Sequence, residues 1–364
     1  MIREAIAQVT SGQALTQEEA AAAMTDIMEG RATPAQVAAW ITALRLRGET
    51  VPEIAGAAIA MRAAAHRITP RVARLVDTCG TGGDGAHTFN ISTAAAIVVA
   101  GAGVPVAKHG NRAVSSQAGS ADVLEALGVE VLLSPASVQQ CIETIGIGFL
   151  FAQVFHPAMR FAAGPRREIG IRTIFNVLGP LTNPAAAPTQ LVGVYSAELV
   201  QPVAEVLDRL GCERALVVHG LEDGVDEISL SGPTLAAFLD HHRVTIRTLT
   251  PQDLGLTAQP PQAVRGESAQ ENAQRIRRLL AGEKGPARDV VLLNAAGALW
   301  AAGVAGDLSQ GVRLAAESID SGAAARRLEE WVMFTRAAKQ AELRQAAQAG
   351  DSPETVEQVR GVAG

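Results

Sequence analysis

From about residue 74 onward, short apolar runs alternate with longer stretches of helical periodicity, and this alternation limits the fold more than any other feature. Strands separated by helices form a mainly parallel sheet with helices on both faces, and such sheets bind ligands at the carboxyl ends of their strands. We therefore expect the loops after Asp77, Ala107 and His219 to carry the function. The predicted strands are 75–77, 104–107, 147–151, 191–195 and 215–219, and the clearest helices between them are 92–102 and 197–210.

The first 70 residues have helical periodicity without the alternation of strands. Thr16 and Glu19 have the spacing of a capping box, which predicts the start of a helix. Thr33-Pro34 predicts a second start, and Gly48 predicts its end. Apolar positions along these segments recur at helical spacing and indicate a packed helical core.

These patterns predict an α/β protein with a small all-helical N-terminal domain and a larger α/β domain, whose mainly parallel central sheet is flanked by helices. The length of 364 residues agrees with about two domains. We place the helical domain at 1–70, joined by helices from about 165–185, and the α/β domain at 74–336. Residues 337–364 are expected to form a helical or frayed extension.

Composition excludes several classes of protein. Apolar residues make up 48% of the chain and charged residues 19%, which argues against disorder. A net charge of -6 argues against a general affinity for nucleic acid or anionic membranes. Ala94–Ala107 is too short to span a bilayer, and Arg3 and Glu4 stand where a secretion signal would be apolar. The three cysteines lack metal-site spacing, so we expect a cytoplasmic protein.

A glycine-rich loop, GTGGDG at 80–85, follows the first predicted strand directly. Four glycines in six residues let the backbone approach an anion and direct several N–H groups towards it. Thr88, Asn90, Ser92 and Thr93 add donors at the start of a helix, where phosphate is favoured. The loop is neither a Walker sequence nor a dinucleotide fingerprint. The polar run that follows favours a phosphate site over the alternative of a purely structural turn.

A second polar loop, KHGNR at 108–112 with Ser115, Ser116 and Ser120, follows the next predicted strand. Neighbouring strands would place it beside the glycine-rich loop and form a donor-rich pocket for more than one phosphate group. Only three of the 31 basic residues are lysine, and Lys108 is the first of them. We interpret Lys108 as a position that needs a compact ammonium group. For Lys108, the alternative is that one lysine was kept by chance in an arginine-biased sequence. For the loop, the alternative is an ordinary solvated loop.

Two adjacent carboxylates, Asp226 and Glu227, follow the strand that ends at His219. Neighbouring side chains on an extended backbone point to opposite sides, so this pair suits two Mg²⁺ ions better than one chelated ion. Ligand phosphates and water would complete the coordination of each ion. An ordinary exposed turn is the alternative, and the position after a strand end favours the metal site.

Arginine is concentrated at PRRE, residues 165–168, and the chain then runs to GPLTNP at 179–184. The guanidinium group suits bidentate capture of a carboxylate. The Gly-Pro and Asn-Pro steps indicate a crossing between the helical part and the sheet, which is a natural hinge. Because surface arginines are common, the pattern alone does not single out one of them as a ligand contact.

Four motifs in order resemble the anthranilate phosphoribosyltransferase family of glycosyltransferases, and the similarity runs from the helical start to about residue 336. The resemblance implies an enzyme that joins anthranilate to the 5-phosphoribosyl group of phosphoribosyl pyrophosphate and releases pyrophosphate, in the second step of tryptophan synthesis. It also implies a magnesium requirement and a homodimer formed through the helical domain. The motifs are GTGGDGAHTFNIST (80–93), KHGNRAVSS (108–116), RREIGIRTIFNVLGPLTNP (166–184) and DEIS (226–229).

The resemblance also implies roles by position. Ser92, Asp226 and Glu227 would be the ligands of magnesium. The pyrophosphate and ribose phosphate of the donor would be held by a larger set, drawn from both polar loops. This set is Gly80, Gly83, Asp84, Thr88, Asn90, Ile91, Ser92, Thr93, Lys108, His109, Gly110, Asn111, Arg112, Ala113, Val114, Ser115, Ser116 and Ser120.

For anthranilate, the resemblance implies contacts with Gly80, Asn111 and Arg166, with Arg166 near the carboxylate. Two departures from the family pattern lie near this acceptor site: Phe155 replaces the first of two histidines, and Pro165 replaces a small aliphatic residue. The aromatic amine is neutral near pH 7, so positioning dominates the chemistry and we assign no general acid or base. Backbone donors, Lys108 and magnesium would stabilise charge on the leaving pyrophosphate.

Two other functions are compatible with the same architecture. A pyrimidine nucleoside phosphorylase would use phosphate as the acceptor, and magnesium-independent phosphorolysis would reveal it. The Asp226-Glu227 pair and the intact glycine-rich loop favour a pyrophosphate donor with metal instead. A non-catalytic relative that binds nucleic acid would need a basic surface, which the net charge of -6 does not supply.

Overall fold

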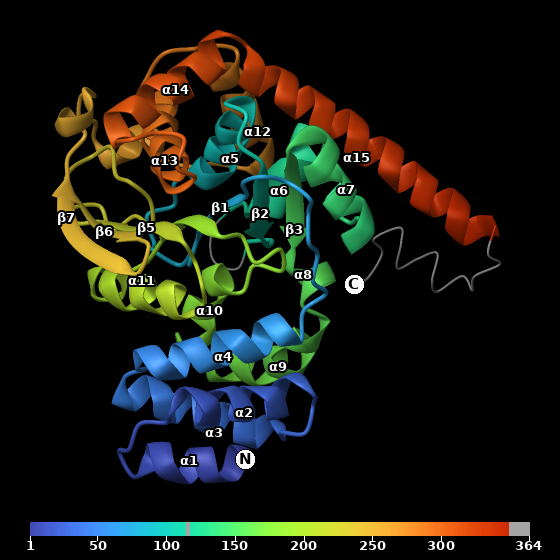
Figure 1. The fold of residues 1–364 in the computed structure, drawn as a ribbon, viewed down its shortest axis with the longest axis vertical. Helices are drawn as coiled ribbons and strands as arrows, with labels where there is room; N and C mark the ends of the chain where they lie inside the picture. The colour runs from blue at the N-terminus through green and yellow to red at the C-terminus, as the bar shows by residue number, and fades with distance from the viewer. Residues whose placement is uncertain (114–116, 349–364) are drawn as a thin grey trace.

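The computed structural model describes residues 1–113 and 117–348, and it shows a helical bundle packed below a layered α/β part (Figure 1). The predicted capping box at Thr16 and the predicted helix start at Thr33 are confirmed, because each hydroxyl accepts a hydrogen bond from the backbone N–H three residues later. Gly48, with φ of 92°, ends the third helix. The bundle helices are α1 (Ile2–Thr10), α2 (Gln17–Met28), α3 (Pro34–Arg47) and α4 (Val51–Ala63).

Over the described residues, one seven-stranded sheet has the order β3-β2-β1-β4-β5-β6-β7. The pairs from β3 to β5 are parallel, which confirms the predicted fold class, whereas β6 and β7 are antiparallel. The strands are β1 (Val76–Gly80), β2 (Val106–Gly110), β3 (Ile147–Phe151), β4 (Thr189–Gly193), β5 (Arg214–Gly220), β6 (Thr234–Asp240) and β7 (Arg243–Leu249).

The hairpin of β6 and β7 was not predicted from the sequence. Its two-residue turn is His241-His242, and both residues adopt positive φ, at 44° and 69°. Turns of this kind are usually recognised by Asn-Gly or Asp-Gly, so the sequence lacks the ordinary hairpin signal.

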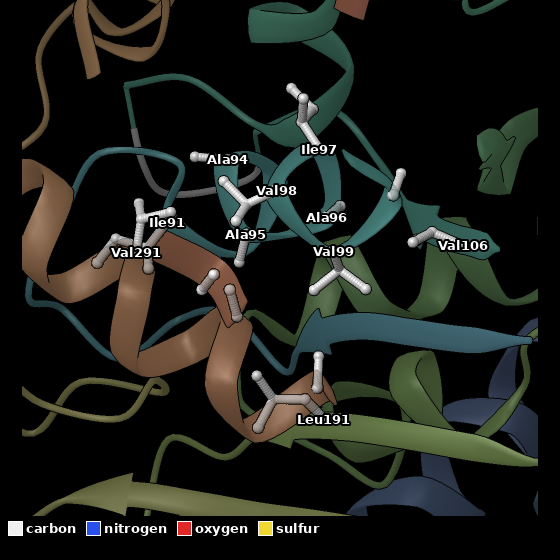
Figure 2. Packing of buried hydrophobic residues seen from close by; sticks show 14 of the residues in the cluster. Ile91, Ala94, Ala95, Ala96, Ile97, Val98, Val99, Val106, Leu191 and Val291 are labelled. Carbon is white, nitrogen blue, oxygen red and sulfur yellow. The ribbon is translucent and has the colours of Figure 1, made fainter. Parts of the chain in front are cut away.

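Helices cover both faces of the sheet and give it two apolar cores. On one face, α5 (Ile91–Gly101) and α13 (Pro286–Ala301) pack on the strands. The small side chains of Ala94, Ala95 and Ala96 let α5 pack closely against its neighbours (Figure 2). On the other face, α11 and the bundle share one core, in which Trp40 belongs to the same cluster as Val192 of β4. The helices outside the bundle are α5 (Ile91–Gly101), α6 (Ser120–Leu127), α7 (Pro135–Ile145), α8 (Ala152–Phe155), α9 (Arg160–Ile169), α10 (Phe175–Leu181), α11 (Val200–Arg209), α12 (Ala269–Leu280), α13 (Pro286–Ala301), α14 (Leu308–Asp320) and α15 (Ala323–Gln348).

Two further contacts shape the borders of the domains. Helix α9 packs on α2 and α3, and Arg62 of α4 donates to the carbonyl oxygen of Leu181 at 2.7 Å. Helix α15 continues through residue 336 without a break, and its Glu342 accepts hydrogen bonds from the Ser134 N–H and the Ser137 hydroxyl at the start of α7. Of the helices in the described ranges, none has the length and apolarity that crossing a bilayer requires.

Candidate functional site

The carboxyl ends of β1 and β2 lie side by side, as expected for neighbouring parallel strands. The prediction that the whole 108–112 segment is a loop was wrong, because Lys108, His109 and Gly110 are the last three residues of β2. They pair with β3, Lys108 opposite Phe149 and His109 opposite Leu150. A charged residue inside a short strand masked its apolar pattern, so the sequence placed the strand end too early.

The glycine-rich loop runs from the end of β1 to the start of α5. Gly82, Gly83 and Gly85 have φ between 64° and 77°, a backbone conformation that favours glycine. Arg172, from the connection between α9 and α10, donates a hydrogen bond to the Gly83 carbonyl and lies over the Tyr195 ring. The loop is therefore held from the side of the helical bundle.

Asp226 reaches this loop although β4 separates β5 from β1 in the sheet. Gly80 of β1 and Gly193 of β4 are register partners, and a Cβ at either position would overlap Asp226. Two facing glycines thus leave room for the segment after β5 to cross the strand ends. The Gly82 N–H donates to Asp226 Oδ2 at 2.7 Å, and the Ser92 N–H donates to Glu227 Oε1 at 3.1 Å. The two carboxylates consequently face two different segments.

The electrostatics of Asp226 and Glu227 favour the binding of a cation. Burial, followed by the charge of Asp84, raises the pKa of Asp226 to about 8. Burial and the neighbouring Asp226 raise the pKa of Glu227 well above its usual value. With the Ser92 hydroxyl, these are the hard oxygen donors that Mg²⁺ prefers. No three histidine, cysteine or acidic side chains converge into a cage within 1–113 and 117–348, so ligand oxygens and water would have to complete any metal site.

Lys108 lies beneath the site and not in an open loop. Its side chain is 1% exposed, and Nζ donates to the Thr78 carbonyl at 2.6 Å and to the Ser92 hydroxyl at 3.2 Å. Burial lowers the pKa of this ammonium group, and the buried Asp77 carboxylate opposes that effect. Asp77 also accepts hydrogen bonds from the His109 N–H at 3.1 Å and from Asn183 at 2.7 Å. The lysine therefore acts on the site from within the sheet.

A second group of residues lies between the bundle and the sheet. Arg166 of α9 stacks on Phe175, with its guanidinium carbon 5.0 Å from the ring centre, and burial lowers its pKa. The described part of the chain places no carboxylate in ion-pair contact with Arg166. Its charge is available to an anion.

Two histidine rings, of which only His109 was a predicted site residue, lie close together at the end of β2. The rings of His109 and His156 have centroids 5.1 Å apart, and His109 Nδ1 lies 3.1 Å from the Gly179 carbonyl oxygen. Burial lowers their pKa values to about 3 and about 4, so both rings are neutral. Each Nε2 is buried without a hydrogen-bond partner in the described structure. His156 is the second histidine of the family pattern in which Phe155 replaces the first, but the sequence analysis gave it no role.

The other residues predicted to bind the phosphoribosyl donor differ in their surroundings. The Arg112 guanidinium is engaged by Asp122 at 2.8 Å and Glu125 at 2.7 Å. Ile91 and Thr93 are both buried, and the Thr93 hydroxyl has no hydrogen-bond partner among the described residues. Asn111 and Ala113 lie on the loop that leads to α6, and Ser120 is the first residue of that helix, while Val114, Ser115 and Ser116 lie outside the described residues.

Comparison with known proteins agrees with this geometry. Residues 3–65 match the helical bundle domain of a glycosyl transferase family, and residues 72–325 match its a/b domain. An anthranilate phosphoribosyltransferase of Moorella thermoacetica is 58% identical over 334 residues, which cover 92% of this chain and 98% of that protein. The chain belongs to the anthranilate phosphoribosyltransferase family. A Geobacter sulfurreducens member is 54% identical over 92% of this chain and 99% of its own.

Solved structures of the family show the same fold. The Thermus thermophilus anthranilate phosphoribosyltransferase has a TM-score of 0.87 and 48% identity, covering 91% of this chain and 99% of its own. The Saccharomyces cerevisiae enzyme, solved in complex with PRPP and Mg, has a TM-score of 0.84 and 28% identity, covering 92% of this chain and 98% of its own.

Proposed function

We propose that this protein transfers the 5-phosphoribosyl group of phosphoribosyl pyrophosphate to the amine of anthranilate, giving N-(5-phosphoribosyl)anthranilate and pyrophosphate, as in the second step of tryptophan biosynthesis. The observation that carries the proposal is the convergence of the glycine-rich loop, the end of β2 and the Asp226-Glu227 segment at one sheet edge. The curated relatives favour this reaction over nucleoside phosphorolysis.

The donor lies along the glycine-rich loop and the first turn of α5. Backbone N–H groups and the helix start bind its phosphates, as the loop conformation allows. Ser92, Asp226 and Glu227 would hold Mg²⁺, as two ions each completed by donor oxygens and water. When bound, the metal supplies positive charge that stabilises the leaving pyrophosphate. The raised pKa values of the two carboxylates support this role, because burial and the repulsion between neighbouring carboxylates disfavour their charged forms unless a cation binds.

Anthranilate is placed on the bundle side, with its carboxylate at Arg166 and with contacts from Asn111 and the Gly80 backbone. Its neutral amine attacks the anomeric carbon as the bond to pyrophosphate breaks, and the new C–N nitrogen then releases its extra proton to solvent water. Lys108 holds positive charge beneath the reaction and orients the Ser92 hydroxyl. The chain's part in the reaction is to bind, orient and balance charge, without a general base.

The decisive experiment is a fluorescence assay of anthranilate consumption with phosphoribosyl pyrophosphate, with and without magnesium. Turnover that requires both the donor and the metal is the expected result. Phosphorolysis of nucleosides without magnesium, or tight DNA binding without turnover, would contradict the proposal.

Arg166→Ala is expected to raise the anthranilate KM by about 10- to 100-fold and to leave the donor KM near its wild-type value. The variant removes a charged hydrogen-bond donor from the acceptor carboxylate, and such bonds contribute about 1.5–3 kcal/mol. The exposed neighbour Arg167 provides the matched control, since Arg167→Ala changes the surface charge equally. An unchanged anthranilate KM in Arg166→Ala would show that the acceptor is assigned to the wrong residue.

The proposal includes a homodimer formed through the helical domain and a cytoplasmic location. An apolar groove of about 680 Å³ between α1 and α3 supports the dimer, with Leu46 at its rim 83% exposed. Three free, buried thiols support a reducing compartment. A single-chain mass in equilibrium sedimentation would contradict the dimer.

A further inference from the structure

A segment far along the chain lies against the end of the glycine-rich loop. The Phe89 N–H donates to the Val264 carbonyl at 3.1 Å, and the Gly266 N–H donates to the His87 carbonyl at 2.7 Å. Thr88 and Arg265 form an antiparallel bridge between the two segments. A Cβ on Gly266 would lie 2.5 Å from the Thr88 carbonyl oxygen, so the two backbones are as close as glycine permits.

Asn272, in the first part of α12, continues this contact with its side chain. The residue is 2% exposed, and its Oδ1 accepts from the Glu267 N–H at 2.9 Å. Its Nδ2 donates to the Glu267 carbonyl at 3.2 Å and to Asn90 Oδ1 at 3.1 Å. The Asn90 Nδ2 donates in turn to the Ala118 carbonyl at 3.0 Å. One chain of amides therefore joins α12, the start of α5 and the loop after β2.

We propose that Asn272 is a positioning residue for the donor site. It fixes the orientation of the Asn90 amide and thereby holds the start of α5 at its proper distance from the loop after β2, the two segments proposed to bind the phosphoribosyl donor. This inference rests on the proposed function. Asn90 occupies the N-cap position of α5, whose first turn presents Ser92, and its amide has one orientation that both accepts from Asn272 and donates to Ala118. Without the hydrogen bond from the Asn272 amide, the Asn90 amide can turn, and the hydrogen bond that links α5 to Ala118 can break.

The sharpest test is Asn272→Asp, which keeps the size and the acceptor for the Glu267 N–H. A carboxylate oxygen then faces Asn90 Oδ1, where a donor stood, so the Asn90 amide must turn and lose its bond to Ala118. The Kd for phosphoribosyl pyrophosphate with Mg²⁺, measured by calorimetry, is expected to rise about tenfold. The anthranilate KM is expected to change little, while the Tm falls because a carboxylate is buried against the Asn90 and Glu267 oxygens. Gln270→Ala, at an exposed position of the same helix, is the control and should keep the wild-type Kd.

Asn272→Ala and the double variant with Asn90→Ala complete the test. If Asn272 acts through Asn90, the two single losses of donor affinity will not add in the double variant. A wild-type donor Kd in Asn272→Asp, equal losses for donor and anthranilate, or a fall in Tm alone would each overturn the inference. A wild-type protein that binds the donor but transfers nothing would overturn the proposed function, and the donor Kd of the variants would still decide this inference.

Discussion

Asp226→Asn is expected to lower kcat/KM for phosphoribosyl pyrophosphate by about 100- to 1,000-fold, the size of effect seen when one preorganised charge-stabilising group is removed. The amide retains an oxygen for the Gly82 N–H, so the loop geometry survives while the negative charge proposed to bind metal is lost. Steady-state kinetics over a range of magnesium concentrations measures the effect. Glu222→Gln, an exposed change in the turn just before, should leave kcat/KM unchanged. A variant with wild-type donor kinetics would remove Asp226 from the metal site.

The same variant carries a second expected result, in stability. In the metal-free folded protein the pKa of Asp226 is about 8, far above its usual value of 3.8. Between these two values the folded state retains a proton that the unfolded state releases, so the stability contributed by this group falls as pH rises through the window. Asp226→Asn removes that loss. Its Tm without metal should therefore decline less than the wild-type Tm between pH 5 and pH 8.

Thermal melts in a chelator at several pH values measure this difference. Magnesium with pyrophosphate should raise the wild-type Tm at pH 8 by mass action and raise the variant Tm less. If the Tm of the two proteins changed equally with pH, the fold would not raise the pKa of the Asp226 carboxyl.

Local rules recovered the parts of the fold that short segments determine. Thr16 and Thr33 cap helices as their spacing predicts, and the strand-helix alternation predicts the parallel sheet. The hairpin around His241 was not predicted because its turn uses residues that rarely adopt positive φ. Where local sequence carries the conformational preference, the prediction is correct, and where tertiary packing imposes the conformation, it fails.

The site shows the same division. The glycine-rich loop and the Asp226-Glu227 pair have compositions that indicate phosphate and metal binding, so the sequence alone could propose residues such as Gly83 and Asp226 for the site. The approach of Asp226 to β1 depends on Gly80 and Gly193, whose register pairing exists only in the folded sheet. Asn272 lies 182 residues from Asn90, and no periodicity or motif links the two. Residues that act through others leave no local pattern.

Lys108→Arg is expected to lower kcat/KM for the donor by at least about 100-fold and to lower the Tm, although the formal charge is kept. Nζ occupies a closed position between the Thr78 carbonyl and the Ser92 hydroxyl, and the side chain is 1% exposed. A guanidinium group is longer and planar, with five N–H donors to satisfy. Overpacking in such a core costs about 1–3 kcal/mol. The arginine would either push Ser92 away from the proposed metal site or leave its own N–H donors unpaired.

Lys284→Arg is the matched control, because Lys284 is exposed and pairs with Asp320, which arginine can do equally well. Lys108→Met separates charge from shape: it fits the cavity but leaves the buried Asp77 carboxylate without its nearby cation, so donor affinity should fall here too. Arginine and methionine at position 108 therefore fail for different reasons, the first by size and the second by charge. A Lys108→Arg enzyme with near wild-type donor kinetics would mean that the ammonium group works from solvent and not from within the sheet.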